Sequence, residues 1–131
     1  MSEHVKKATA LRNASAGCPN CAETIFLTYA EELGLTEEQA LMLGTNFGGG
    51  MKCGGTCGVL TSGMAVLGAL GITDPQSVGK FLNSIKENHS GLSNCVDLLR
   101  ANAKKGGQKK QHCDGMIVEA VNLIDELAKN R

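Results

Sequence analysis

One glycine-rich stretch, residues 48–58, constrains the fold more than any other part of this 131-residue chain. Six of its eleven residues are glycine and two are cysteine, Cys53 and Cys57. A backbone with so few side chains can turn sharply and approach another group closely. The next segment, residues 59–70, is apolar nearly all round and is predicted to be a buried central helix. Cys57 is then expected at the N-terminus of that helix, where exposed N–H groups and the helix dipole favour a thiolate over a thiol.

Apolar residues elsewhere in the chain recur with helical spacing, and no segment alternates convincingly with a period of two. Helix signals divide the chain: Pro19 in a first turn, Gly34 at a helix end, Thr36 with Gln39 as a capping box, the Asp74–Pro75 pair, and Ser93 or Asn94 as a cap. We therefore expect an all-α fold, a compact single-domain bundle of five to six helices with the apolar helix at its centre. Residues 1–16 are predicted to be a mobile N-terminal arm or a short peripheral helix, and residues 17–131 one helical domain that carries the cysteines.

Composition excludes several classes of function. The chain has 13 basic and 13 acidic residues, so no overall field attracts it to nucleic acid. Only 3% of the residues are aromatic, which leaves no platform for stacked bases. No apolar run is long enough for membrane insertion, and no hydrophobic region of a secretory signal follows the charged N-terminus. The expected location is the cytoplasm, where six cysteines indicate metal binding or redox work more often than structural disulfides.

Five of the six cysteines are expected in the first turns of helices. Cys18 and Cys21 open the first confident helix, Cys57 opens the central one, Cys95 follows a cap, and Cys113 heads the last helix, while Cys53 lies in the glycine loop. Such positions favour thiolates, by about 0.3–1 kcal/mol for each exposed helix end. We expect at least four of these thiols to share one site, with Cys57 as the activated thiolate.

Three interpretations of the cysteines remain open. They can be thiol and disulfide partners that exchange electrons with an unidentified redox partner, and the Cys18–Cys21 spacing is typical of such centres. They can instead hold zinc or an iron–sulfur cluster, with Cys21, Cys57, Cys95 and Cys113 as the ligands. In the third interpretation the chain is a helical interaction module whose cysteines only pack. Six cysteines allow 15 complete pairings, so the sequence leaves the pairing open.

A series of short motifs resembles the family of small redox-active proteins named for a C_GCAxxG_C_C cysteine pattern. The resemblance runs from Cys18 to Leu127 and rests on Cys21-Ala22, Phe47-Gly48-Gly49-Gly50, Thr56-Cys57-Gly58, Cys95 before Asp97-Leu98, and Cys113. It implies that Cys21, Cys57, Cys95 and Cys113 are the four characteristic cysteines, with Cys18 and Cys53 as auxiliary or resolving thiols. The chain departs from the pattern after Cys57, where Val59 replaces an alanine and Ser62 stands in place of a glycine.

The remaining candidate residues have ordinary structural interpretations. His112, beside Cys113, is expected to be a solvated histidine at a helix end, although a base or a metal ligand remains an alternative. His4 and His89 stand in polar surroundings and are expected at the surface. Four methionines are expected to fill the core: Met42, Met51, Met64 and Met116.

Overall fold

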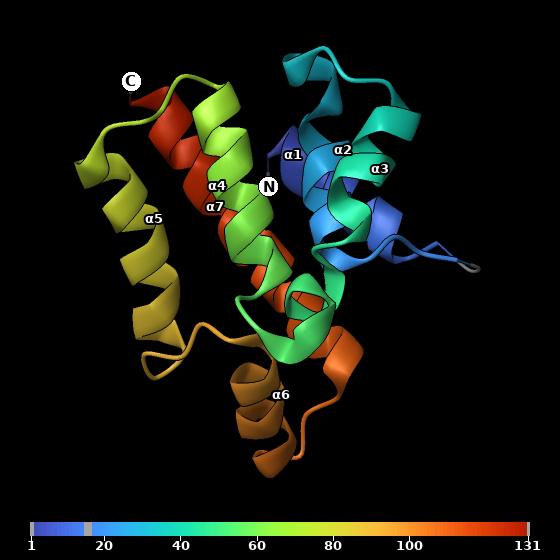
Figure 1. Cartoon of the computed structure of the whole chain (residues 1–131), viewed down its shortest axis with the longest axis vertical. Coiled ribbons are helices and arrows are strands. Elements are labelled where there is room, and N and C mark those ends of the chain that lie inside the picture. Colours follow the sequence, from blue (N-terminus) through green and yellow to red (C-terminus); the bar gives the residue numbers. More distant parts are fainter. Residues whose placement is uncertain (1, 15–16, 131) are drawn as a thin grey trace.

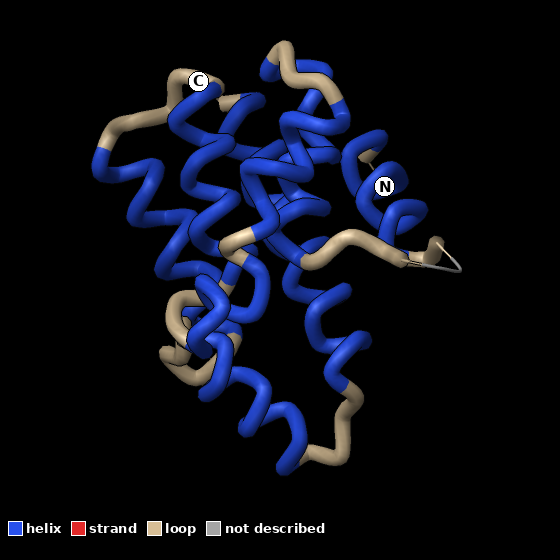
Figure 2. The backbone as a smooth tube through the Cα atoms, turned by 45° about the vertical axis from the view of Figure 1, so that its right-hand side comes forward, coloured by secondary structure: helices blue, strands red, loops and turns tan. Residues whose placement is uncertain are grey.

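The computed structural model describes residues 2–14 and 17–130, and within these ranges every regular element is helical (Figures 1 and 2). Seven α-helices and one short π-helical turn, η1, follow one another: α1 (Glu3–Arg12), α2 (Cys21–Leu33), α3 (Glu37–Thr45), η1 (Gly50–Gly54), α4 (Gly58–Ala69), α5 (Pro75–Asn88), α6 (Cys95–Lys104) and α7 (Lys109–Lys129). The predicted all-α class is therefore confirmed. The predicted number of five to six helices is wrong, because α1 is an additional helix.

Two helices, α4 and α7, form the middle of the bundle and contact each other (Figure 1). Helix α4 buries much of its length, as its apolar composition predicts. Its Gly63 faces the ring of Phe81 on α5, and a Cβ at this position would clash with that ring. Helices α1, α2 and α3 lie to one side of the central pair in Figure 1 and α5 to the other, while α6 lies beyond one end. Because Gly63 has no side chain, α4 can approach α5 closely at Phe81.

Helix boundaries follow the capping signals of the sequence. The Asn20 side chain accepts a hydrogen bond from the Glu23 N–H, and Thr36 accepts one from Gln39, each within a complete capping box. Gly34 ends α2 in the left-handed conformation, and Asp74 caps α5 before Pro75. One position was predicted wrongly: because Asn20 is the cap, Cys18 and Pro19 precede α2 instead of lying in its first turn.

Of the two alternatives predicted for residues 1–16, a mobile arm or a short peripheral helix, the structure contains the helix; Met1, Ser15 and Ala16 lie outside the described residues. Helix α1 packs against α7 and α2, and it buries Val5 and Ala8 three residues apart on one face. Its His4 lies between Asp125 of α7, at 2.8 Å, and Glu32 of α2, at 2.5 Å. This spacing of buried residues is the signal that distinguishes a docked helix from an arm.

Two large apolar side chains of α3, Met42 and Leu43, face outward, which the sequence analysis did not predict. Met42 is 68% exposed, although it was expected in the core, and Leu43 is 48% exposed. Met51 and Met64 are exposed as well, so of the four methionines expected in the core only Met116 is buried. Small residues make the contact instead: Ala40 and Gly44 are buried, and Gly44 lies directly on the backbone of α2. In residues 2–14 and 17–130 no helix combines the length and the apolar character needed to cross a membrane.

Candidate functional site

The glycine-rich segment folds into a tight turn that brings its backbone against α6. Gly49, Gly50 and Gly54 have φ values between 65° and 72°, and Met51 and Lys52 adopt the same left-handed region at 58° and 60°. Non-glycine residues rarely occupy this region, and doing so costs about 1–3 kcal/mol at each position. The surrounding structure must therefore hold the turn in place.

Part of that support comes from the close approach of Gly50 to Cys95. A Cβ on Gly50 would lie 2.7 Å from the Cys95 Cβ, so a larger residue has no room there. The Gly55 N–H donates to the Gly50 carbonyl at 2.9 Å and closes the turn. The glycines thus allow the loop to pack directly on the first residue of α6.

A short antiparallel bridge fixes Cys57 relative to Cys95. Thr56 pairs with Asn94, the Cys57 N–H donates to the Ser93 carbonyl at 2.8 Å, and the Cys95 N–H donates to the Gly55 carbonyl at 2.6 Å. Residues that flank such a pair point to the same face of the ribbon, because side chains alternate along each strand. Cys57 and Cys95 therefore share a face, one as the N-cap of α4 and the other as the first residue of α6.

Cys21 reaches the same region from the start of α2. It is the first residue of that helix, directly after the capping residue Asn20. A Cβ on Gly58 would lie 3.0 Å from the Cys21 Sγ and 2.6 Å from the Phe47 carbonyl oxygen. The absence of a side chain at Gly58 is therefore what lets α2 and its thiol approach the start of α4.

Ser62 replaces the expected glycine one turn into α4 without disturbing this approach. Its hydroxyl is buried and donates to the Gly58 carbonyl at 2.5 Å. Val59, the other departure from the family pattern, is fully buried and lines the same pocket as Cys57. The helix therefore accommodates both substitutions next to Cys57.

Cys113 approaches from α7. This helix begins at Lys109, so Cys113 lies in its second turn and not at its head as predicted. His112 precedes it, is only half-exposed, and packs its ring edge-on against His89 with the ring centroids 5.9 Å apart. His89 in turn lies 2.8 Å from the Glu119 carboxylate. Neither histidine is the freely solvated residue that the sequence suggested.

The four helix segments enclose one pocket with a volume of about 290 Å³. All four cysteines that the family resemblance selects line it: Cys21, Cys57, Cys95 and Cys113. The other lining residues are Arg12, Asn20, Gly49, Val59, Leu98, Leu99, Lys109, Lys110, His112 and Met116. Cys18 and Cys53 are not among them; Cys53 is exposed on η1, where its thiol contacts the Gly50 carbonyl at 3.4 Å. All six cysteines are free.

Burial, and not the helix dipole, dominates the electrostatics of the thiols. It raises the pKa of Cys57 to about 12, against hydrogen bonds from the Val59 and Leu60 N–H groups that lower it. Burial also raises the pKa of Cys21 and of Cys113. A negative charge on Cys95 raises the pKa of both thiols further. Burial therefore acts against the thiolate that the sequence predicts at Cys57. Loss of hydration outweighs the N-terminal position because Cys57 is only 7% exposed.

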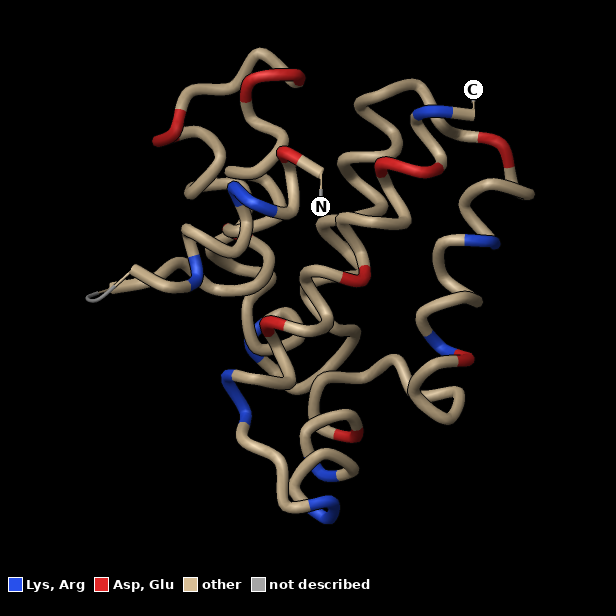
Figure 3. Tube along the Cα trace, turned by 180° about the vertical axis from the view of Figure 1, so that it is seen from behind, with Lys and Arg blue, Asp and Glu red and all other residues tan. Residues whose placement is uncertain are grey.

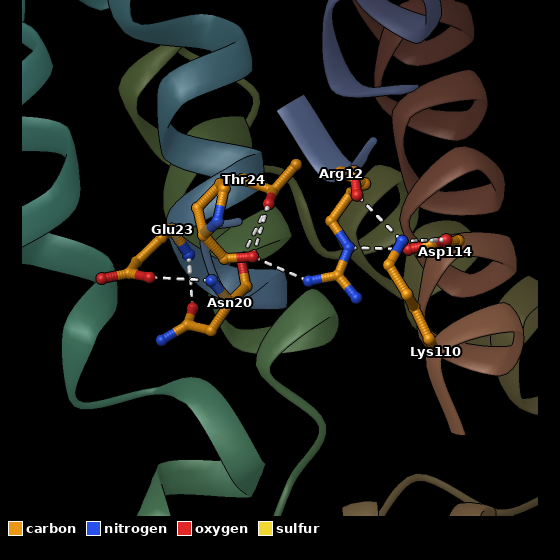
Figure 4. A network of polar contacts seen from close by, with 7 residues as sticks. Arg12, Asn20, Glu23, Thr24, Lys110 and Asp114 are labelled. Atoms are coloured by element: carbon orange, nitrogen blue, oxygen red, sulfur yellow. Dashed lines mark hydrogen bonds and ion pairs between the residues drawn. The ribbon is translucent and has the colours of Figure 1, made fainter. Parts of the chain in front are cut away.

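Arg12 is the main residue of the pocket that the sequence analysis missed (Figure 4). Its guanidinium donates to the Asp114 carboxylate at 2.6 Å and to the Pro19 carbonyl at 2.7 Å, so it joins α1, α7 and the turn before α2. Lys110 reinforces this corner by donating to the Arg12 carbonyl and to Asp114. The positive charge of Arg12 lowers the pKa of Cys21 and of Cys113, in opposition to burial. Helix α1 is therefore part of the site.

The thiols do not form a preorganised metal centre. Across residues 2–14 and 17–130, no group of three His, Cys, Asp or Glu side chains is arranged to hold one metal ion. Zinc and iron–sulfur clusters need several sulfur donors at bonding distance from the metal. The donor set as it stands does not fit either group, and no chemical step is assigned to a metal.

Comparison with known proteins finds a family whose model matches most of the chain. Residues 19–127 match the model of the family described as "Putative redox-active protein (C_GCAxxG_C_C)", a range that includes all four pocket cysteines and excludes Cys18. No curated protein and no solved structure matches this chain significantly. Because the family model covers most of the chain, this protein belongs to the C_GCAxxG_C_C family.

Proposed function

We propose that this protein carries out thiol–disulfide exchange with the four cysteines of its pocket. One observation carries the proposal: Cys21, Cys57, Cys95 and Cys113 come from four different helices and line the same 290 Å³ pocket. Cysteines used only for packing have no reason to gather from distant parts of the chain around an open cavity. A general redox role also agrees with the family to which the chain belongs.

Burial and nearby charges favour different roles for the four cysteines, one as the attacking thiol and another as the resolving thiol. Burial raises the pKa of Cys113, but this thiol is less buried than Cys57, and the charges of Arg12 and Lys109 oppose the effect of burial on its pKa, so we assign the attack on an incoming disulfide to Cys113. Cys21 is the resolving partner in this proposal, since both thiols line the pocket and both lie within the influence of the Arg12 charge. Cys57 and Cys95, held on one face by the antiparallel bridge, form a second pair.

The exchange conserves atoms and electrons. The Cys113 thiol loses its proton, and its sulfur attacks one sulfur of the substrate disulfide, releasing one substrate thiol and leaving a mixed disulfide. Cys21 then attacks the Cys113 sulfur and releases the second substrate thiol. The protein dithiol is oxidised by two electrons, the substrate disulfide is reduced by two, and both protons end on the released thiols. Cys18 and Cys53 lie outside the pocket and take no part in this exchange. The proposed setting is a reducing compartment such as the cytoplasm.

Quantitative thiol titration tests this function. The protein is equilibrated with mixtures of oxidised and reduced dithiothreitol, quenched with acid, alkylated, and its free thiols are counted by mass spectrometry. We expect thiols to be lost and recovered in pairs, and Cys113→Ser to lose this reversible step. Cys53→Ser is the matched control, because its thiol lies outside the pocket, and it should retain the step. Thiols that stay reduced in every mixture, or a Cys113→Ser variant that behaves as wild type, would refute the proposal.

A further inference from the structure

The charged residues around the thiol pocket are of one sign. Arg12, Lys109 and Lys110 line it, and none of the lining residues that the structure describes is aspartate or glutamate. The nearest carboxylate in the network, Asp114, is already paired with both Arg12 and Lys110. Three cations therefore face one carboxylate, and in the described part of the chain Lys109 makes no ion pair. The mouth of the pocket carries a surplus of positive charge although the whole chain is neutral.

Figure 3 shows the wider setting of this surplus. Basic residues predominate at the end of the molecule where α6 ends and α7 begins, whereas acidic residues are more frequent toward the opposite end. The residues that contribute there include Lys104 and Lys105 at the end of α6 and Lys109 and Lys110 at the start of α7. A neutral chain with its charge separated in this way steers ligands by their charge.

The inner walls of the pocket set a limit on size and polarity. Val59, Leu98 and Met116 are buried apolar residues that line it. Its volume of about 290 Å³ lies just below the range of about 300–1,000 Å³ that is usual for ligand sites. A small molecule with an apolar middle and a charged end therefore fits better than a segment of folded protein.

We propose that the substrate of this pocket is a small disulfide that carries carboxylate groups. This inference depends on the proposed thiol–disulfide exchange and adds the chemical class of the substrate. The sulfur–sulfur bond enters between the thiols, and a carboxylate lies against the cationic side formed by Arg12, Lys109 and Lys110. The same cations stabilise the thiolate that leaves when Cys113 attacks, before that thiolate takes up a proton.

Three small disulfides of different charge test the inference. The rate constants of the reduced protein with 3,3′-dithiodipropionate (a dianion), bis(2-hydroxyethyl) disulfide (uncharged) and cystamine (a dication) are measured at low ionic strength. Each is divided by the rate constant of 2-mercaptoethanol with the same disulfide, because the three leaving thiols differ in intrinsic reactivity. We expect the normalised rate for the dianion to exceed that for the dication by at least about tenfold. The preference should nearly vanish in about 1 M salt, where the screening length falls to about 3 Å.

Two lysine variants locate the source of the preference. Lys109→Gln removes a lining cation that has no ion pair in the described structure, and the dianion-to-dication ratio should fall by at least about threefold. Lys129→Gln makes the same charge change at the other end of α7, about 30 Å away at 1.5 Å per residue, and should leave the ratio at its wild-type value.

The outcomes separate this inference from the function on which it depends. If none of the three disulfides oxidises the protein, the proposed exchange itself is refuted. If all three react and the normalised rates are equal or favour cystamine, exchange stands and the anionic substrate is refuted. An equal decrease of the dianion-to-dication rate ratio in Lys109→Gln and Lys129→Gln would also refute the anionic substrate. The preference would then come from the net charge of the protein and not from the pocket.

Discussion

Burial of the Cys57 thiol should make the stability of the protein fall at alkaline pH. The pKa of Cys57 rises from 9.0 to about 12 when the protein folds, because the thiolate loses its hydration. A group whose pKa is raised in the folded state contributes stability that is complete below the unfolded pKa and is lost as the pH rises through the folded pKa. At about pH 10 the unfolded chain has ionised Cys57 almost completely and the folded protein has not. Between about pH 8 and pH 10 this one thiol should therefore lower the free energy of unfolding by about 1 kcal/mol.

The assay is urea denaturation of the reduced protein at the two pH values, compared with Cys57→Ser and Cys57→Ala. Other groups that titrate in this range act on all three proteins, so the difference between wild type and variant isolates Cys57. Both variants lack the thiol. Between the two pH values the free energy of unfolding of each variant should therefore fall by about 1 kcal/mol less than that of wild type, whatever its value at the lower pH. An equal loss in all three proteins would show that burial leaves the Cys57 pKa unchanged. A smaller loss in wild type would show that the helix N-terminus outweighs burial and holds the Cys57 pKa below its usual value.

Two further predictions concern the packing at Cys21 and the docking of α1. Gly58→Ala places a Cβ 2.6 Å from the Phe47 carbonyl oxygen and should lower the free energy of unfolding by about 1–3 kcal/mol in urea denaturation. Gly68→Ala in the same helix meets no atom within 4 Å and should instead raise it, by up to about 1 kcal/mol; a loss in both variants would contradict the packing argument. Burial lowers the pKa of His4, but its hydrogen bond to Glu32 and the neighbouring Asp125 raise it by more, so charged His4 stabilises the fold below its unfolded pKa of about 6.5. Wild type should therefore lose about 0.2–1 kcal/mol more than His4→Gln as the pH rises from about 6 to 8, and an equal loss would show that the His4 contacts contribute nothing.

Local signals in the sequence were sufficient to predict the class of fold and several helix boundaries. Asn20, Thr36 and Asp74 cap helices because their side-chain oxygens accept hydrogen bonds from N–H groups that the helix leaves free. Such interactions involve residues three positions apart, so the sequence contains all the partners. The outward-facing Met42 is different, because its exposure depends on how α3 packs on α2 through the small residue Gly44. That packing is a tertiary property, which a local pattern does not reveal.

The candidate site also depends on contacts between distant parts of the chain, which the sequence did not reveal. The resemblance to the family singled out the four cysteines that line the pocket, but it gave no indication of Arg12, which enters from α1 and pairs with Asp114 on α7. The effect of burial on the Cys57 pKa was not predicted for a related reason. Position at a helix N-terminus is visible in the sequence, whereas the depth of burial that raises the pKa depends on residues from several helices.

Disulfide mapping of the oxidised protein tests most directly whether the pocket cysteines exchange with a disulfide. The reduced protein is treated with one equivalent of a small disulfide, free thiols are alkylated in acid, and the linked peptides are identified by mass spectrometry. We expect an intramolecular disulfide between two of the four pocket cysteines, with Cys113–Cys21 formed first, while Cys18 and Cys53 are alkylated as free thiols. Bonds that involve only Cys18 or Cys53, or links between separate molecules in place of an internal bond, would contradict exchange in the pocket.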